Sequence, residues 1–392
     1  FQAFAMSASD EIDRHVTRKY DIVQKLGKGA YGIVWRATDK RTKDVVALKK
    51  IFDAFQNATD AQRTFREVMF LQEMKGHEHI VSLLNVLKAD NDRDIYLVFE
   101  HMETDLHAAI RANILQDVHK QYIMWQTLKA LKFMHSANLL HRDMKPSNLL
   151  LNSDCLMKVA DFGLARSMRE PGETVDDADE PHCFTDYIAT RWYRAPEILL
   201  GSNNYSEAVD MWGAGCILGE ILGGKPVFAG SSTIQQLELV CDLIGTPDWD
   251  REKCEKCSLY THNMLGNLNV QNPKGASPGE WNNRFPGASE KAIDLLKKLL
   301  KFDPSERITA HDALKHHYLD QFHDEFVERE APVQVKVSIP DNEKRSTNHY
   351  RERLYKEVAE FRKQEKQEAS HAQEPNIGMG RGRNKGMVMG AA

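Results

Sequence analysis

The pattern of hydrophobic and polar residues changes about a quarter of the way along the chain. Its first part holds short apolar runs rich in β-branched and aromatic residues, which predict strands at Tyr20–Leu26, Ile33–Ala37, Val45–Lys49 and Ile95–Phe99. Beyond Asp105 the apolar residues recur every three or four positions, as in Gln121–His135, which predicts amphipathic helices. One earlier helix is predicted at Thr59–Met74, with a capping box formed by Thr59 and Gln62. A strand-rich first part is therefore followed by a mainly helical remainder.

A glycine-rich segment separates the first two predicted strands. It reads Gly27-Lys28-Gly29-Ala30-Tyr31-Gly32-Ile33-Val34. Dinucleotide-binding folds share this G-x-G-x-x-G spacing, but there the glycines open a helix. Here β-forming residues follow, which favours a strand–turn–strand flap whose bare backbone can approach phosphate groups. An oxidoreductase is the disfavoured alternative.

The third predicted strand offers a lysine to such a pocket. Side chains alternate along a strand, so Ala47 and Lys49 share one face, whereas Lys50 fits a solvated edge lysine. Glu67, inside the predicted helix, is the expected ion-pair partner of Lys49. The strand at Ile95–Phe99 should line the back of the pocket, with Phe99 as a bulky gatekeeper or as plain core.

Two polar motifs follow the helix at Gln121–His135. The first reads His141-Arg142-Asp143-Met144-Lys145-Pro146-Ser147-Asn148, and the second reads Asp161-Phe162-Gly163. The apolar runs between them, at residues 149–151 and 157–159, predict a short hairpin. Together they resemble the catalytic loop and the magnesium-binding loop of protein kinases.

Each polar residue of these two motifs has its own chemical reason. Asp143 fits the carboxylate that accepts the proton of the substrate hydroxyl, and Lys145 can neutralise charge on the moving phosphoryl group. Asn148 and Asp161 offer the oxygen ligands that Mg²⁺ prefers. Degenerate kinases that act only as scaffolds usually lack Lys49, Asp143 or Asp161, and all three are present, which disfavours a purely scaffolding role.

The segment after Asp161-Phe162-Gly163 indicates a family. A polar stretch at Ser167–Phe184, expected to be a mobile loop, precedes Thr185-Asp186-Tyr187 and then Ala189-Thr190-Arg191-Trp192-Tyr193-Arg194-Ala195-Pro196-Glu197. Over about residues 18–325 the chain resembles the mitogen-activated protein kinases, and most closely their atypical branch of extracellular-signal-regulated kinases 7 and 8. Two features depart from the family pattern. Asp186 stands where most animal members carry Glu, and the acidic docking cluster is weak, because Asp341 and Glu343 are mixed with Lys344 and Arg345.

The resemblance implies an α+β, bilobal protein-kinase fold that uses ATP and Mg²⁺. It implies catalytic roles for Asp143, Lys145 and Lys49, metal ligands at Asn148 and Asp161, and activating phosphorylation at Thr185 and Tyr187. The implied nucleotide site comprises Leu26, Gly27, Lys28, Gly29, Ala30, Tyr31, Gly32, Ile33, Val34, Ala47, Lys49, Glu67, Glu100 and Met102. The implied phosphate-binding arginines are Arg66, Arg142, Arg166, Arg191 and Arg194, although nearby carboxylates could pair with them instead.

Further elements and partners follow from the same resemblance. The helix that begins near Asp210 should anchor the catalytic loop, and Arg307 should pair with Glu197. Arg194 should occupy a backbone carbonyl near Ala189, which favours protein substrates with Ser/Thr-Pro sites. Upstream kinases and phosphatases are expected partners, autophosphorylation is expected to contribute to activation, and the implied location is cytoplasmic, with the nucleus and cilia or flagella as further sites.

The expected organisation has five parts. They are an N-terminal extension (1–19), a small lobe (20–103), a large lobe (104–319) with an insert near 245–281, a C-terminal extension packed on the kinase (320–365) and a disordered tail (366–392). The 392 residues are 42% hydrophobic, with a net charge of −5 that gives no strong nucleic-acid signal. We expect no signal peptide and no membrane span. Six irregularly spaced cysteines suit a reducing compartment, and Cys254 with Cys257 forms only a weak zinc motif.

Overall fold

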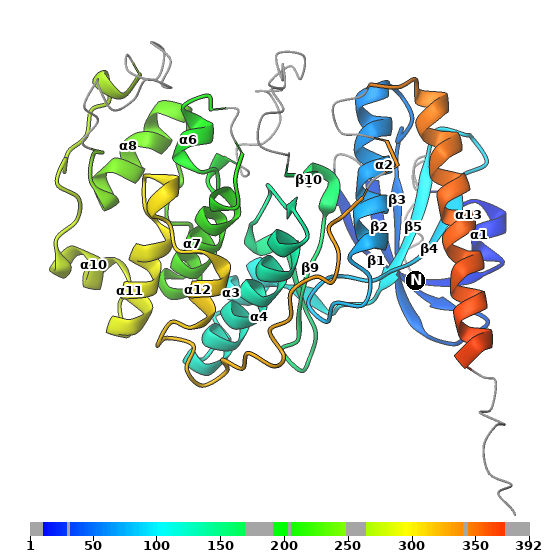
Figure 1. The fold of residues 1–392 in the computed structure, drawn as a ribbon, viewed down its shortest axis with the longest axis horizontal. Helices are drawn as coiled ribbons and strands as arrows, with labels where there is room; N and C mark the ends of the chain where they lie inside the picture. Colours follow the sequence, from blue (N-terminus) through cyan, green and yellow to red (C-terminus); the bar gives the residue numbers. More distant parts are fainter. Residues whose placement is uncertain are drawn as a thin grey trace, which may run out of the picture.

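The computed structural model describes residues 11–29, 32–168, 191–202, 205–247, 264–336, 338–339 and 344–372, the last nine of them by backbone alone. These residues form a small lobe built on one antiparallel sheet and a larger, mainly helical lobe (Figure 1). The predicted α+β, bilobal fold class is therefore confirmed. Among the described residues, no helix is long and apolar enough to cross a membrane.

The small lobe holds the only sheet of more than three strands in the described part of the chain. Its five strands are ordered β1-β2-β3-β5-β4, with each neighbouring pair antiparallel. Their bounds are β1 (Tyr20–Gly29), β2 (Gly32–Asp39), β3 (Val45–Ile51), β4 (Leu83–Lys88) and β5 (Ile95–Glu100). The large lobe carries the short strands β6 (Thr104–Asp105), β7 (Leu139–Leu140), β8 (Leu149–Leu151), β9 (Met157–Val159) and β10 (Arg166–Ser167).

Helices make up most of the large lobe and flank the small one. The small lobe is flanked by α1 (Arg14–Thr17), α2 (Ala58–Glu73) and α13 (Thr347–Ala372). The large lobe contains α3 (Leu106–Arg111), α4 (Asp117–Ser136), α6 (Pro196–Leu199), α7 (Ala208–Gly223), α8 (Thr233–Ile244), α10 (Pro278–Arg284), α11 (Glu290–Leu299) and α12 (Ala310–Leu314). The hairpin predicted between the two catalytic motifs is present as β8 and β9.

Helix α2 begins one residue before the predicted helix. Asn57 is the N-cap, and its side chain accepts the N–H of Asp60 at 2.9 Å. The predicted capping box of Thr59 and Gln62 is therefore wrong. The Asn57 side chain, two residues earlier, caps the helix because its oxygen reaches a free N–H group of the first turn.

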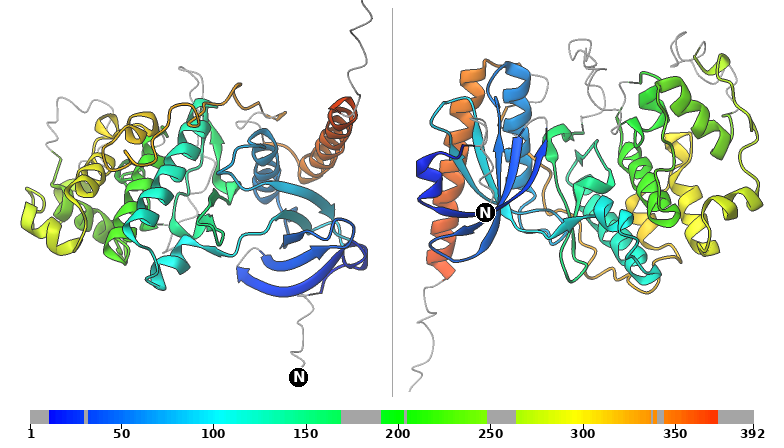
Figure 2. Two further views of the ribbon diagram at one scale, coloured as in Figure 1. Left: turned by 90° about the horizontal axis from the view of Figure 1, so that it is seen from below. Right: turned by 180° about the vertical axis from the view of Figure 1, so that it is seen from behind.

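The C-terminal helix returns to the small lobe and packs on α2 (Figure 2). Tyr350, Leu354 and Val358 of α13 are buried in one cluster with Phe65 and Val68 of α2. The rings of Phe65 and Tyr350 lie 5.7 Å apart. The core of the small lobe thus contains residues from near both ends of the chain.

Lys50 is not the solvated lysine that strand alternation predicts. Its side chain is buried, and its Nζ donates to the carbonyl of Glu11 at 3.0 Å, lies 3.5 Å from Asp94 and sits over the ring of Tyr96. The segment before β1 covers this face of the sheet. A local pattern cannot show that covering, because it depends on a contact between distant parts of the chain.

Candidate active site

Lys49 and Glu67 form an ion pair that joins β3 to α2. Lys49 Nζ donates to Glu67 Oε1 at 2.8 Å, and the Glu67 side chain is almost fully buried. Burial alone would lower the pKa of Lys49, but the carboxylates of Glu67 and Asp161 outweigh it and raise that pKa. Lys49 is therefore a stable cation at neutral pH, held beside Asp161.

Asp143 lies at the centre of the catalytic loop. Lys145 Nζ donates to Asp143 Oδ2 at 2.5 Å, and Asn148 Nδ2 donates to the same oxygen at 3.1 Å and to the Asp143 carbonyl at 2.8 Å. The backbone N–H of Asp143 in turn donates to His141 Nδ1 at 3.2 Å. The carboxylate is buried and oriented by two side chains from its own loop, so the loop brings together Asp143, Lys145 and Asn148 as expected.

Asp210, in the first turn of α7, anchors that loop. Its Oδ2 accepts the N–H of His141 at 2.9 Å and lies 3.0 Å from His135 Nε2, and its Oδ1 accepts the N–H of Arg142 at 2.8 Å. Burial would raise the pKa of Asp210, but the hydrogen bond from His135 and the neighbouring imidazoles hold that pKa below its ordinary value. The helix containing Asp210 therefore anchors the loop, in line with the family pattern.

Gly213, on the next turn of α7, allows this close approach. A Cβ atom at Gly213 would lie 2.6 Å from the Cβ of Met144, which is closer than real Cβ contacts allow. Arg142 has a left-handed backbone with φ 67°, which an L residue adopts only when its surroundings hold it there. The two hydrogen bonds from residues 141 and 142 to Asp210 supply that restraint.

Asp161 has a strained backbone conformation. Its φ of 65° and ψ of 70° are left-handed, and it directly precedes the short 3₁₀ turn Phe162–Leu164. Burial would raise the pKa of Asp161, but the charges of Lys49, Arg63 and Lys145 lower it. The N–H of Ala160, next to Asp161, donates to the backbone carbonyl of Asn148 at 2.9 Å, so the two segments adjoin. A carboxylate and an amide oxygen are ligand types that suit a hard divalent cation.

Arg63 is a site residue that sequence analysis did not identify. Its guanidinium lies so close to Gly163 that a Cβ there would be 2.7 Å from Arg63 Nε. Arg63 precedes Glu67 by four residues, so the two share one face of α2. That helical spacing is the signal in the sequence that could have identified Arg63.

The glycine-rich segment forms the ends of β1 and β2. Gly29 pairs with Gly32 across the hairpin, and the intervening residues 30 and 31, including the predicted Ala30 and Tyr31, lie outside the described residues. A Cβ on Gly32 would lie 2.0 Å from the carbonyl oxygen of Lys50, so only glycine allows β2 to approach β3 here. Because the glycines lead into a strand, a dinucleotide-binding βαβ unit is excluded.

The remaining residues of the predicted nucleotide site have different environments. Ala47 pairs with Phe99 across β3 and β5. Ile33 is buried in a core cluster that also contains Val16 and Trp35, so its side chain packs inside the small lobe. Leu26 is exposed, Val34 is half-buried, and Gly27 and Lys28 are exposed on β1.

Glu100 ends β5 at the junction between the lobes. Its Oε1 accepts the N–H of Ser82 at 2.7 Å and lies 3.0 Å from Lys158 Nζ on β9. Met102, two residues later, is buried. The Glu100 side chain therefore links this junction to the strand that leads to Asp161, and Lys158 is a second residue that sequence analysis did not identify.

Three of the predicted phosphate-binding arginines come from segments that meet. Arg166 pairs with Leu140 across β10 and β7, which places it beside the strand that leads into Arg142. Arg66 is buried in α2, which packs against residues 162–164. Arg142 stacks its guanidinium 3.9 Å from the centre of the Tyr205 ring. Thr185, Tyr187 and Ala189 lie outside the described residues, so the structure does not place them relative to these arginines.

Arg191 and Arg194 begin the next described segment. Arg191 Nη1 donates to the carbonyl of Ser231 at 3.0 Å, and the N–H of Arg194 donates to the carbonyl of Arg191 at 3.1 Å. Arg307 pairs with Glu197 as expected, and the pair is bidentate, at 2.7 and 2.6 Å. This pair is buried and ties the short helix α6 to the large lobe.

Comparison with known proteins agrees with this geometry. The protein kinase domain family matches residues 20–319. Extracellular signal-regulated kinase 2 of Dictyostelium discoideum is 57% identical over 369 residues, covering 94% of this chain and 98% of the relative. Mitogen-activated protein kinase 15 of Xenopus laevis is 50% identical over 352 residues, covering 89% of this chain and 58% of the relative. Extracellular signal-regulated kinase 7 of Drosophila melanogaster is 45% identical over 346 residues, covering 88% of this chain and 37% of the relative.

The two lobes and the loops between them define a protein kinase, the class of enzyme that takes ATP and a divalent metal ion. The chain belongs to the mitogen-activated protein kinases, which are serine/threonine kinases. It is similar to the branch that includes extracellular signal-regulated kinase 7 and mitogen-activated protein kinase 15. The predicted family and enzyme class are therefore confirmed. The chain spans nearly all of the Dictyostelium relative but little more than half of the Xenopus one.

Proposed function

We propose that this kinase transfers the γ-phosphoryl group of ATP to Ser or Thr residues that precede proline, and that phosphorylation of Thr185 and Tyr187 activates it. The observation that carries the catalytic part is the arrangement of Asp143. This buried carboxylate is held by Lys145 and Asn148, beside a separate cluster of Lys49, Glu67 and Asp161. The Asp143 carboxylate can thus act on the attacking hydroxyl, while the cluster of Lys49, Glu67 and Asp161 acts on the phosphates of ATP.

The proposed roles follow from charge and position. Asp143 orients the substrate hydroxyl and accepts its proton as the new P–O bond forms. Lys145 offsets negative charge on the transferred group, and Lys49, oriented by Glu67, holds the phosphates that precede it. Asn148 and Asp161 would hold Mg²⁺, which neutralises phosphate oxygens when bound.

Kinase assays on two variants test these roles. Lys49→Met and Asp161→Asn should each lower kcat/KM by at least about 10²-fold, because each removes a charge aimed at the transition state. Asp154→Asn, in the exposed turn between β8 and β9, is the matched control and should leave activity unchanged. Near-normal activity of either active-site variant, with the fold verified by circular dichroism, would refute the assigned roles.

The proposed switch rests on arginines from both lobes. A phosphate on Thr185 would add about −1.5 to −2 charge and three strong acceptor oxygens. Arg66 on α2, Arg142 in the catalytic loop and Arg166 on β10 come from segments that pack together, so one phosphate could hold all three. Arg191 and Arg194 are the proposed partners of the Tyr187 phosphate.

The switch and its source require separate experiments. Protein treated with phosphatase should be at least tenfold less active than the doubly phosphorylated form, and equal activities would rule out the switch. We infer that this kinase adds part of the two phosphates itself, either to its own chain or to another copy of it. Asp143→Asn protein expressed alone in bacteria should then lack both phosphates, whereas full phosphorylation would assign the reaction to another kinase.

The proposed preference for proline rests on hydrogen bonding. If Arg194 occupies a backbone carbonyl near Ala189, that carbonyl cannot accept the N–H of a substrate residue after the phosphoacceptor. An ordinary residue would then bury an unpaired N–H at a cost of about 1–3 kcal/mol, whereas proline has none. Paired peptides that differ only in Pro or Ala should differ in kcat/KM by about 5-fold to 150-fold. Equal values would exclude the mechanism.

A further inference from the structure

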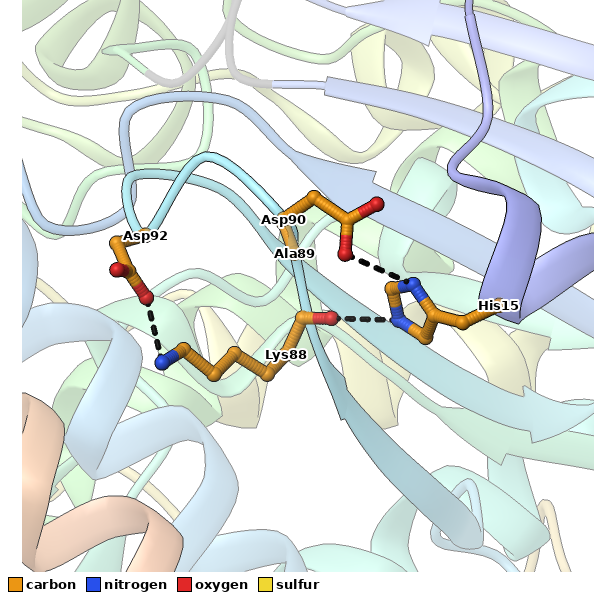
Figure 3. A pocket seen from close by; sticks show the side chains of 5 residues that line it. All are labelled: His15, Lys88, Ala89, Asp90 and Asp92. Atoms are coloured by element: carbon orange, nitrogen blue, oxygen red, sulfur yellow. Dashed lines mark hydrogen bonds and ion pairs between the residues drawn. The ribbon is translucent and has the colours of Figure 1, made fainter.

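Three side chains of metal-ligating type meet on the small lobe, away from the active site. Asp13 and His15 lie at the start of α1, and Asp90 follows β4. One ligand atom from each lies within 4.8 Å of the other two. Figure 3 shows the His15 imidazole directed at the Asp90 carboxylate. We propose that Asp13, His15 and Asp90 bind a divalent transition-metal ion of the zinc type.

The hydrogen bonding of His15 is the first argument. His15 Nε2 lies 2.8 Å from the carbonyl oxygen of Lys88, which can only accept, so Nε2 carries a hydrogen. Nδ1 is shielded from solvent, makes no hydrogen bond and lies 3.2 Å from Asp90 Oδ1. With the Nε2 hydrogen directed at that carbonyl, Nδ1 faces the Asp90 carboxylate, and the pair of atoms can hold either a proton or a metal ion between them. Histidines that bind metals are commonly oriented in this way, with the second ring nitrogen bonded to a backbone carbonyl.

The distances are the second argument. Zinc binds nitrogen and oxygen at about 2.0–2.2 Å in tetrahedral geometry, which separates two ligand atoms by roughly 3.3 Å. The observed 3.2 Å between His15 Nδ1 and Asp90 Oδ1 matches one such edge. Asp13 Oδ2 accepts the N–H of Asp90 at 2.7 Å, which orients the third ligand toward the other two. Two carboxylates and a neutral imidazole also balance a charge of +2.

The surroundings supply access and room for water. An open depression of about 280 Å³ is lined by His15, Lys88, Ala89, Asp90 and Asp92 (Figure 3). Lys88 directs its ammonium group to Asp92 at 2.6 Å, so this cation pairs with a carboxylate outside the proposed ligand set. A solvent molecule can therefore complete the coordination, as it does where zinc has three protein ligands.

The ligand types distinguish this site from the magnesium site of the cleft. Mg²⁺ prefers oxygen ligands and retains several waters, whereas an imidazole with carboxylates suits zinc and its neighbours in the first transition series. A bound ion would join the segment before β1 to the turn between β4 and β5. It would therefore stabilise the small lobe without contacting ATP.

The test is a zinc titration of the full chain, first freed of metal. A Cys254→Ser/Cys257→Ser background removes the one C-x-x-C pair, and native mass spectrometry gives the stoichiometry while calorimetry gives the affinity. Millimolar Mg²⁺ should not displace the zinc. His15→Ala and Asp90→Asn should each lose one zinc equivalent or weaken its binding by at least about tenfold.

The control uses a second histidine–aspartate pair that lacks a third ligand. His317 Nδ1 lies 3.3 Å from Asp320 on an exposed surface, so His317→Ala should leave the zinc stoichiometry unchanged. Zinc should also raise the melting temperature of the background protein but not that of His15→Ala, while kinase activity with Mg²⁺ stays equal in both. Zinc binding that is absent, or identical in His15→Ala, would overturn the proposal and leave His15 and Asp90 as an ion pair.

Discussion

The two sides of the active site are held in place in different ways. Asp143 belongs to a loop whose preceding residues donate two backbone hydrogen bonds to Asp210, which is buried within the large lobe. On the opposite side, Lys49 is oriented by one ion pair with Glu67, which reaches from strand β3 to helix α2. The carboxylate is thus fixed by the folding of its own lobe, whereas the lysine depends on where one helix lies.

Two contacts set the position of that helix. Arg63 of α2 lies against Gly163 in the turn after Asp161, and the other side of α2 packs on Tyr350 and Leu354 of α13. We expect a change in either contact to alter the Lys49–Glu67 pair more than the catalytic loop, because both contacts lie on α2. We therefore expect the geometry of the lysine side to be the more easily perturbed of the two, and the following variants test this.

Asp210→Asn should have the largest effect. An amide NH₂ would face a backbone N–H, and the buried imidazole of His135 would lose its anion. Loss of one partner in a buried charged network costs about 3–5 kcal/mol. Urea unfolding should show that decrease together with loss of peptide phosphorylation. Asp117→Asn, an exposed residue in the first turn of α4, should change neither by more than a few tenths of a kcal/mol.

Leu354→Ala should affect mainly the lysine side. Leu354 is fully buried against α2, and removing a buried leucine costs about 2–4 kcal/mol. We expect lower stability and lower activity, with the activity restored in part by saturating ATP, because ATP binding favours the assembled site. Lys356→Ala on the exposed face of α13 is the control. Full activity in Leu354→Ala would show that α13 does not position α2.

Glu67→Gln should affect catalysis more than folding. Lys49 keeps Asp161 as a neighbour, so the charge stays partly compensated, but the orientation by α2 is lost. We expect kcat/KM to fall by about 10-fold to 100-fold, within the range for a lost electrostatic contact. Glu73→Gln, one turn and a half later and exposed, should retain activity. A larger loss in Glu73→Gln than in Glu67→Gln would contradict the assignment.

The smallest effect at neutral pH is expected at the junction of the lobes, where two buried histidines make the stability depend on pH. Burial, then charges including Lys129, lowers the pKa of His77 to about 3 and of His79 to about 4. Below pH 6.5 the unfolded chain takes up protons that the folded chain excludes, so stability falls as the pH falls toward 4. The slope is about 1.4 kcal/mol per pH unit for each histidine.

His77→Gln should make this decline shallower between pH 6.5 and 4.5. His77 packs its ring 4.4 Å from Phe133 of α4, so the variant should also be less stable at pH 7, by a constant amount. Urea midpoints measured across the range give the slope separately from that offset. His317→Gln, whose ring is exposed, should keep the wild-type slope, and an unchanged slope in His77→Gln would disprove the effect.

Much of the architecture was predictable because its signals are local. Strand alternation and helical spacing located β1 to β3, β5, α2 and α4, and the order of Asp143, Lys145, Asn148 and Asp161 identified the catalytic loops. The helix cap was misplaced because Asn57 lies just outside the apolar pattern. Lys50 was misassigned because the N-terminal segment covers it.

The remaining features depend on contacts across long stretches of chain. The pairing of Glu100 with Lys158 joins residues from different lobes, and no spacing rule links them. The approach of Arg63 to Gly163 depends on how α2 packs on the turn after Asp161. Such contacts arise from the packing of distant segments, so the sequence pattern alone does not predict them. The roles assigned to Thr185 and Tyr187 stay predictions, because both residues lie outside the described part of the chain.

The return of α13 to the small lobe has a consequence for synthesis. Helix α2 and strand β5 leave the ribosome early, yet Tyr350, Leu354 and Val358 complete their core only after about 260 further residues. At about 5–20 residues per second, that interval lasts roughly 15–50 s. During it, the apolar faces of Phe65 and Val68 lack their final cover. The nascent small lobe should therefore be a chaperone client until translation reaches the C-terminal helix, and its folding should finish after that of the large lobe.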